Sequence, residues 1–245
     1  SFFESLRDKL KENNIHLDLY YGKLKNEEAL RGDEVDLDWA HFRDNKIIRI
    51  FGKELYWQPV LKEIKNADLV IAEQANKLLI NYVLSFLRKF SKLKFAYWGH
   101  GLDLQAAEGS LGNIFKKIYS SHCDWWFAYT KGVAARIEKI GFPMSKVTIV
   151  QNAIDSKKLL QYKNEISTEE LDNKRKALNL GKGPVAIYAG GLVSIKGIDI
   201  LIDSCKLIRK AVPDFEIIVM GNGPLRKEVE QWAAENSWVH YIGTK

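Results

Sequence analysis

The chain has 245 residues, 46% hydrophobic and 28% charged, a length and composition that exclude wholesale disorder and allow a buried core without staples. Two cysteines are too few for a disulfide scaffold or an all-cysteine metal cluster. The 37 Lys and Arg against 31 Asp and Glu leave a net charge of +6, which suits an anionic small ligand, a membrane surface or a nucleic acid equally.

Targeting signals are absent from the pattern of the sequence. The first fifteen residues alternate charged with apolar side chains, unlike the apolar core of a signal peptide. The longest apolar run, Leu78–Leu87, is too short for a membrane-spanning helix, which needs about 20 residues. We therefore expect a cytoplasmic protein in which Cys123 and Cys205 are reduced thiols of the core.

Short apolar strands alternate with amphipathic helices along residues 1–155. Residues 23–46 have no clear period and are expected to form a long loop. In chain order, the other predicted elements are a helix at 2–10, strands at 15–21 and 46–51, a helix at 55–65, a strand at 68–72, a helix at 76–90, a strand at 94–98, a helix at 111–120, a strand at 124–129, a helix at 132–140 and a strand at 146–150.

After Asp155 the sequence changes character. Residues 156–183 are rich in Lys, Asn and Glu and are interpreted as a linker or helical hinge. In chain order, the elements predicted beyond it are a strand at 184–189, a helix at 196–212, a strand at 215–220, a helix at 225–236 and a strand at 238–242. Strand–helix–strand units of this length imply parallel sheets covered by helices, so the fold class is α/β.

We expect two domains, at 1–155 and 184–245, and both chain ends look cut. The first domain opens with a helix where a strand is expected, and the second stops after three strands. A half-finished sheet would leave an exposed edge. We therefore expect the second domain to be incomplete.

One loop carries the best local signal for a ligand. A strand ends in Gly190 and Gly191, which let backbone approach a ligand closely, and Lys196 and Gly197 then open a helix whose N-terminus favours an anion. The spacing matches neither the dinucleotide fingerprint nor the Walker A loop. A tight strand-to-helix turn with a solvated lysine remains the alternative interpretation.

A second turn of this kind is Gly221-Asn222-Gly223-Pro224, where Pro224 suits the first position of a helix. A plain turn without a ligand is the alternative. Loops that follow parallel strands gather at one edge of the sheet, which is where open α/β sheets bind ligands. Both loops are therefore expected at that edge.

In order and spacing, these motifs resemble the family 4 glycosyltransferases. The segment from Val185 to Gly243, with YAGGLVSIKG and VMGNGPLRKE, is similar to their nucleotide-binding half. The start of the chain and the segment CDWWFAYTKGVAARIEKIGFPMSKVTIVQNAID resemble their acceptor domain and hinge. The resemblance implies the GT-B fold, in which two Rossmann-like parallel-sheet domains face each other.

The resemblance implies a retaining transfer of a sugar from a nucleotide-sugar donor to a glycan or lipid-linked acceptor, in polysaccharide or cell-envelope synthesis, without a bound metal or other cofactor. Lys196 would contact the donor diphosphate, and the loop at Gly243 would lie near the base. The family usually has Arg where this chain has Gly191, so one expected phosphate contact is missing.

His100 follows a strand in Trp98-Gly99-His100-Gly101, at the position of the family's cleft histidine. A histidine there could donate a hydrogen bond or handle a proton near neutral pH, with Asp103 as a possible orienting partner. The alternative is a structural histidine that bonds to the backbone. The resemblance names His100 as the candidate catalytic residue.

In the family, the acidic E-x7-E motif would come after residue 245 of this numbering, so we expect a fragment that is inactive alone. One alternative function is a non-catalytic homologue that binds a nucleotide or a partner, and Gly191 favours it. Another is a nucleotide-sugar epimerase of the same fold, against which the Lys196-Gly197 context argues.

A basic stretch lies between Lys77 and Lys94, with no acidic residue and with aromatic residues between the cations. One interpretation is a half-buried helix with a basic end. A peripheral contact with an anionic membrane is the second, because such surfaces attract basic and aromatic side chains. Nucleic-acid binding ranks third, and we expect no nucleic-acid partner.

Overall fold

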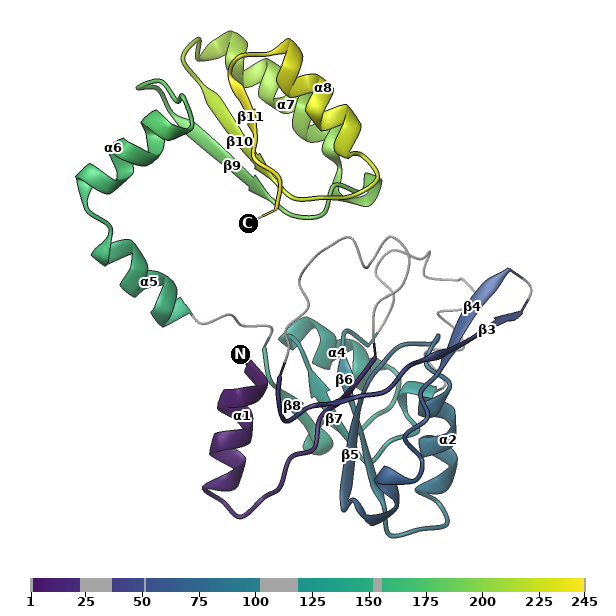
Figure 1. Cartoon of the computed structure of the whole chain (residues 1–245). Helices are drawn as coiled ribbons and strands as arrows, with labels where there is room; N and C mark the ends of the chain where they lie inside the picture. Colours follow the sequence, from purple (N-terminus) through teal and green to yellow (C-terminus); the bar gives the residue numbers. More distant parts are fainter. Residues whose placement is uncertain (1, 23–36, 51, 102–118, 152–155, 245) are drawn as a thin grey trace. The chain divides into compact units, whose positions relative to one another are not determined.

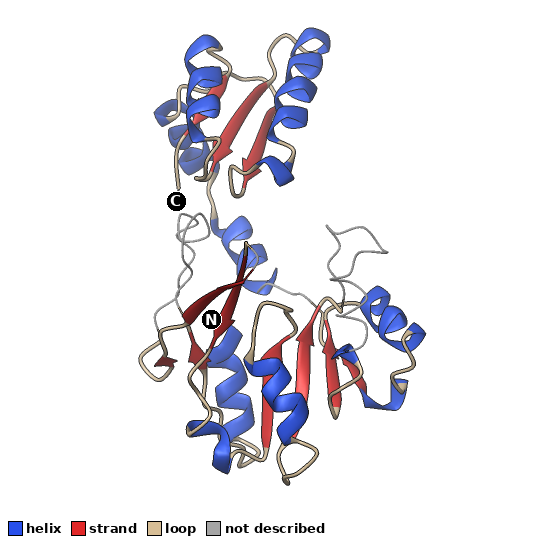
Figure 2. Ribbon diagram, turned by 90° about the vertical axis from the view of Figure 1, so that its right-hand side faces the viewer, coloured by secondary structure: helices blue, strands red, loops and turns tan. Residues whose placement is uncertain are grey.

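The computed structural model describes residues 2–22, 37–50, 52–101, 119–151 and 156–244 (Figure 1). Their contacts divide them into two compact units, the first within Ser1–Ile154 and the second within Asp155–Lys245. Each unit contains a parallel sheet with helices packed along its strands (Figure 2). The predicted α/β class with two parallel sheets is therefore confirmed.

The main sheet of the first unit has the strand order β5-β6-β7-β8, with every pair parallel. Its strands are β5 (Leu69–Glu73), β6 (Lys94–Gly99), β7 (Trp125–Ala128) and β8 (Val147–Ile149). The sequence predicts each of these strands to within two residues at either end. All four carboxyl ends consequently meet at one edge of the sheet.

The core of the first unit lies under helices α2 (Ile80–Leu87) and α4 (Lys131–Lys139). Alternate residues of β6 and β7, including Tyr97 and Trp126, face these helices and are fully or almost fully buried. Thr130 caps α4, since its hydroxyl accepts the Val133 backbone N–H at 3.2 Å.

Helix α1 (Phe2–Lys11) lies against the other face of this sheet. The ring of Phe2 packs edge-on against the ring of Trp98, with 5.6 Å between the ring centres. Asn14 ends the helix region in the left-handed conformation, with φ at 58°, which asparagine tolerates better than most residues.

The predicted helix at 55–65 is wrong. Strand β4 (Lys53–Trp57) occupies its start and pairs antiparallel with β3 (Lys46–Ile50) through a turn at Gly52. Pro59 follows, and only the short 3₁₀ helix η2 (Glu63–Asn66) remains. Tyr56 and Trp57 are residues that fit a pleated strand, and a proline removes a helical hydrogen bond.

Two further elements are shorter than predicted. Of the predicted strand at 15–21, only β1 (Tyr20–Tyr21) is paired, in parallel with β2 (His41–Phe42). The predicted helix at 76–90 narrows to α2, because turns replace its first residues. Most of the predicted helix at 111–120 lies outside the described residues.

The second unit has the strand order β11-β10-β9, again parallel throughout. Its strands are β9 (Val185–Ala189), β10 (Glu216–Met220) and β11 (Val239–Tyr241), and its helices are α7 (Ile198–Ala211) and α8 (Arg226–Glu235). Both helices lie on the same face of the sheet (Figure 1). The buried residues Ile217, Val219, Cys205 and Trp232 form the core between them.

The segment interpreted as a linker contains two helices, α5 (Ser156–Glu165) and α6 (Thr168–Ala177). A reciprocal capping box begins α6: the Ser167 hydroxyl accepts the Glu170 N–H, and the Glu170 carboxylate accepts the Ser167 N–H. Arg175, near its end, donates to the carbonyls of Gly181 and Gly183. The end of α6 is thereby tied to the strand that opens the second sheet.

Both cysteines are buried, and neither forms a disulfide. Burial raises the pKa of the Cys123 thiol to about 12, so this thiol stays neutral at physiological pH. In the part of the chain that the structure describes, every helix is too short or too polar to cross a bilayer.

Candidate functional site

Three glycine-containing loops meet at the carboxyl edge of the second unit's sheet. They follow β9, β10 and β11 and contain Gly190, Gly221 and Gly243 respectively. The Gly190 N–H donates to the Met220 carbonyl at 3.0 Å, and the Gly221 N–H donates to the Gly243 carbonyl at 2.9 Å. The structure thus brings the three predicted loops together through their backbones.

Side chains would not fit where these loops touch. A Cβ on Gly221 would overlap the carbonyl oxygen of Gly190, and one on Gly223 would overlap the carbonyl oxygen of Leu192. Gly221 also has φ at +146°, which residues with a side chain rarely adopt. Asn222 stabilises the turn, because its side-chain oxygen accepts the Gly223 N–H at 2.9 Å. Glycine at these positions is required by close backbone packing.

The loop after β9 delivers the chain into the N-terminus of α7. It passes through Gly191 and the 3₁₀ helix η4 (Ser194–Lys196) to Gly197, which caps α7 in the left-handed conformation with φ at 64°. The first backbone N–H groups of a helix have no partner within it, and the helix dipole makes this end positive. The exposed Lys196 adds a cation immediately before them, whereas Asp199 adds an anion in the first turn.

His100 belongs to the first unit and directly follows β6. Its side chain is exposed, and its ring packs edge-on against Tyr129 with 4.5 Å between ring centres. Gly99 and Gly101 flank it, and Gly101, with φ at +74°, lies against Val133 of α4. His100 therefore stands at the carboxyl edge of the first sheet, held by an aromatic contact. Its proposed partner Asp103 lies outside the described residues.

Sequence reasoning missed two residues at this same edge. Gln74 directly follows β5, and its N–H donates to the Trp98 carbonyl at 2.9 Å. Asn81 lies in the first turn of α2, and its side-chain amide donates to the Glu73 carbonyl at 2.9 Å. The available signal was Asn81 itself, a lone amide inside the apolar run Leu78–Leu87.

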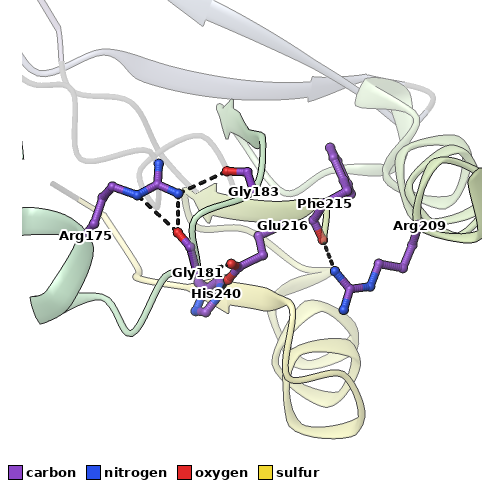
Figure 3. A network of polar contacts seen from close by, with 7 residues as sticks. All are labelled: Arg175, Gly181, Gly183, Arg209, Phe215, Glu216 and His240. Carbon is purple, nitrogen blue, oxygen red and sulfur yellow. Dashed lines mark hydrogen bonds and ion pairs between the residues drawn. The ribbon is translucent and has the colours of Figure 1, made fainter. Parts of the chain in front are cut away.

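A second polar cluster lies at the opposite edge of the second sheet (Figure 3). Glu216 begins β10, and its carboxylate contacts the His240 ring at 2.6 Å and accepts the Gly181 N–H at 2.5 Å. Arg209 of α7 donates to the Phe215 carbonyl at 2.6 Å. A depression of about 340 Å³ lies beside this cluster.

This second cluster is better explained as a structural tie than as a ligand site. Both Glu216 oxygens already have partners, and the guanidinium groups of Arg175 and Arg209 donate to backbone carbonyls. The cluster also lies at the amino ends of the strands, whereas open α/β sheets bind ligands at the carboxyl ends. Among the described residues, moreover, no group of three His, Cys, Asp or Glu side chains is placed to hold a metal ion.

Comparison with protein families gives one match. Residues 170–243 match the model of the family described as glycosyl transferases group 1. The match covers the three strands and both helices of the second unit's sheet, with all three glycine loops. A comparison with curated proteins gives no match.

Solved structures resemble both units. Anabaena Alr3699/HepE in complex with UDP and glucose has a TM-score of 0.56 and 15% identity, over 99% of this chain and 59% of that one. A glycosyltransferase from Rickettsia africae ESF-5 has a TM-score of 0.56 and 16% identity, over 98% and 58%. UDP-GlcNAc 2-epimerase from Neisseria meningitidis, bound to UDP-GlcNAc, has a TM-score of 0.53 and 18% identity, over 76% and 51%.

These likenesses confirm the predicted GT-B-like fold. The chain spans between 51% and 59% of the length of these three proteins. The resemblance of the second unit to group 1 glycosyltransferases is also borne out by the family match. Placement in family 4 in particular stays a prediction, as do the domain boundaries and the roles of the site residues.

Proposed function

We propose that this chain belongs to a glycosyltransferase that moves a hexose or related sugar from a nucleoside-diphosphate sugar to a glycan or lipid-linked acceptor. The proposal includes retention of configuration, a role in polysaccharide or cell-envelope synthesis and a cytoplasmic location. The observation that carries it is the convergence of three glycine loops and the α7 N-terminus at one sheet edge. The family match and the nucleotide-sugar complexes of similar structures support it.

The second unit would hold the diphosphate of the donor. Phosphate oxygens would accept hydrogen bonds from the first N–H groups of α7, while the Lys196 ammonium offsets the negative charge that builds up on the departing nucleoside diphosphate. This arrangement supplies cationic stabilisation from the chain itself, so we propose no bound metal or other cofactor. The loop at Gly243 would lie beside the base.

The first unit would receive the acceptor, at the edge that carries His100. Because this imidazole is exposed, it can donate a hydrogen bond to the transferred sugar or exchange a proton with it. Its ring packs edge-on against the ring of Tyr129, which holds it in place. We propose His100 as the catalytic residue of this unit.

Lys196→Ala is expected to weaken binding of UDP about tenfold or more, because a charge-assisted contact with phosphate contributes about 1.5–3 kcal/mol. Calorimetric titration of the 245-residue chain with UDP measures this change. Lys206→Ala is the control, since Lys206 is an exposed α7 lysine that pairs with Asp203 at 3.5 Å. Equal affinities for the Lys196 and Lys206 variants would rule out the assigned phosphate contact.

A non-catalytic nucleotide-binding or partner-binding homologue is the second candidate, and Gly191 favours it because that position carries no cationic side chain. It shares the binding site of the first proposal and differs only in turnover. An epimerase of this fold is the third, since one similar structure is such an enzyme. Product analysis after incubation of the protein with UDP-glucose or UDP-GlcNAc, in the presence and absence of a sugar acceptor, separates transfer to the acceptor, epimerisation of the donor and binding alone.

We also propose a peripheral contact with anionic membranes through the end of α2. Phe86 and Phe90 are 61% and 74% exposed, and their rings lie 4.9 Å apart. Lys89 and Lys92 are exposed beside them, whereas Arg88 is engaged with Asp124 at 3.0 Å. An exposed aromatic pair among lysines suits an anionic lipid surface.

Replacing both Phe86 and Phe90 by serine should reduce the fraction that sediments with phosphatidylglycerol-containing vesicles several-fold, because the apolar insertion is lost while the lysines remain. Ile200 and Leu207, which are 68% and 66% exposed on α7, provide a matched double serine control. Unchanged sedimentation of the Phe86 and Phe90 variant would contradict the proposed contact.

A further inference from the structure

A small polar cavity lies in the first unit at the carboxyl edge of its sheet. Gln74 follows β5 there, and the backbone of Gly99, directly before His100, lies against it. The cavity has a volume of about 10 Å³, which is room for about one water molecule or one hydroxyl group. Its lining includes Gln74, Ala75, Asn76, Asn81, Tyr82, Tyr97 and Tyr119.

Two buried amides reach this cavity with their donors engaged and their acceptors unmet. Gln74 is 7% exposed, and its Nε2 donates to the Ser120 hydroxyl at 2.9 Å. Asn81 is 3% exposed, and its Nδ2 donates to the carbonyls of Glu73 and Ala75 at 2.9 and 3.3 Å. Among the described residues, neither Gln74 Oε1 nor Asn81 Oδ1 has a hydrogen-bond partner. A buried acceptor left in this state costs about 1–3 kcal/mol.

The two amides differ in how firmly they are oriented. Asn81 is fixed, because turning its amide over would place Oδ1 against two carbonyl oxygens. Gln74 faces the hydroxyl of Ser120, which can donate as well as accept. With its amide turned over, Gln74 accepts from Ser120 and presents Nε2 to the cavity. The cavity then offers one donor and one acceptor.

One donor beside one acceptor is the pair that a hydroxyl group takes. A cation is a poorer fit, because the described residues of the lining include no carboxylate and, among them, the two amide oxygens without a partner are those of Gln74 and Asn81. The hydroxyl of Tyr82 is already used, since it donates to the Asn76 carbonyl at 2.8 Å. The rings of Tyr82 and Tyr119, at 88° to each other and 4.6 Å apart, form an aromatic wall beside the amides.

We propose that Gln74 and Asn81 bind one hydroxyl group of a hexose-class acceptor at this edge, and so determine which sugar the first unit accepts. The inference rests on the proposed function for the identity of the ligand as an acceptor. Gln74 lies under Gly99, so a sugar held by this pair sits beside His100. The two residues are specificity-determining rather than catalytic.

The test compares glucose with its series of monodeoxy derivatives as probes of the whole chain, with binding followed by shifts of the backbone amides of Gln74 and Gly99. Wild-type protein should bind one deoxy derivative about tenfold more weakly than glucose, because that analogue leaves the Asn81 oxygen without a donor. Gln74→Met should weaken glucose binding about tenfold and reduce the discrimination, because the hydroxyl then keeps only its contact with Asn81. Gln161→Met, at an exposed glutamine of α5, is the matched control.

Equal affinities across the deoxy series, or no glucose binding at this edge, would overturn the inference. The two amides would then be bonded to an ordered internal water molecule instead. The wild-type series gives this answer even if Gln74→Met does not fold. In a separate titration of the whole chain, UDP binding is followed by the shifts of the backbone amides of the second unit. Absence of UDP binding with hydroxyl discrimination intact would reject the proposed function and retain the hydroxyl site.

Discussion

Gly221→Ala should destabilise the second unit by about 3 kcal/mol or more and abolish measurable UDP binding. The added Cβ would overlap the carbonyl oxygen of Gly190, so the loops after β9 and β10 could not stay in contact. The Tyr241 hydroxyl, which donates to the Gly221 carbonyl at 2.9 Å, would be displaced as well. Backbone overlap cannot be relieved by a rotamer change, which places this substitution among the severe ones. Chemical denaturation and calorimetry with UDP measure the two effects.

Gly243→Ala provides the comparison for Gly221→Ala. Gly243 has φ at +70°, but an added Cβ would meet no atom within 4 Å. The Gly243→Ala variant should therefore lose about 1–2 kcal/mol of stability, which is the cost of placing a residue with a side chain in the left-handed conformation. If both variants lost the same stability, conformational strain rather than close packing of the loops would explain the glycines.

Trp126→Ala is expected to cost the first unit about 3–5 kcal/mol, the usual range for a large aromatic residue removed from a core. Trp126 is fully buried, and its indole Nε1 donates to the Ser120 carbonyl at 2.7 Å. Ser120 in turn holds Gln74, so the cavity at the carboxyl edge should loosen with it. Hydrogen exchange of the β6 and β7 amides should accelerate by about a hundredfold or more.

The neighbouring Trp125 is a natural control for Trp126. Successive residues of a strand face opposite sides, and Trp125 is 37% exposed, with its Nε1 donating to the Thr148 hydroxyl at 2.9 Å. Trp125→Ala should cost about 1 kcal/mol. Amides of β10 should exchange at unchanged rates in the Trp126 variant, and acceleration there would contradict the division into two units.

The sequence predicts the second unit closely because its signals are local and agree with one another. Each strand is a short apolar run that ends at glycine, and each helix has one apolar face. The glycines of the loops were predicted as ligand contacts, and the structure adds that Gly221 and Gly223 are required by packing between loops. Sequence spacing does not show that contact, since it joins Gly221 with Gly190, and Gly223 with Leu192, across 31 positions of the chain.

The first unit is harder to predict from the sequence, because contacts between distant segments decide which of its residues form strands. Alternation predicts a strand at 15–21, but only Tyr20 and Tyr21 find a partner strand. Residues 55–65 have apolar residues at roughly helical spacing, yet hairpin pairing with β3 extends β4 to Trp57. The pairing of Gln74 with Asn81 around one cavity depends on the fold of α2 against β5, and a single amide in an apolar run cannot specify it.

Mapping UDP onto the backbone amides of the chain by NMR tests the central claim most directly. We expect saturable shifts at the carboxyl edge of the second sheet, in the loop from Gly190 to Ile198, at Gly221 to Gly223 and at Gly243. Amides around Glu216 and His240, at the opposite edge, should stay unchanged. Shifts confined to that opposite edge, or a spectrum without any response at millimolar UDP, would contradict the proposal that the second unit binds the nucleotide of a sugar donor.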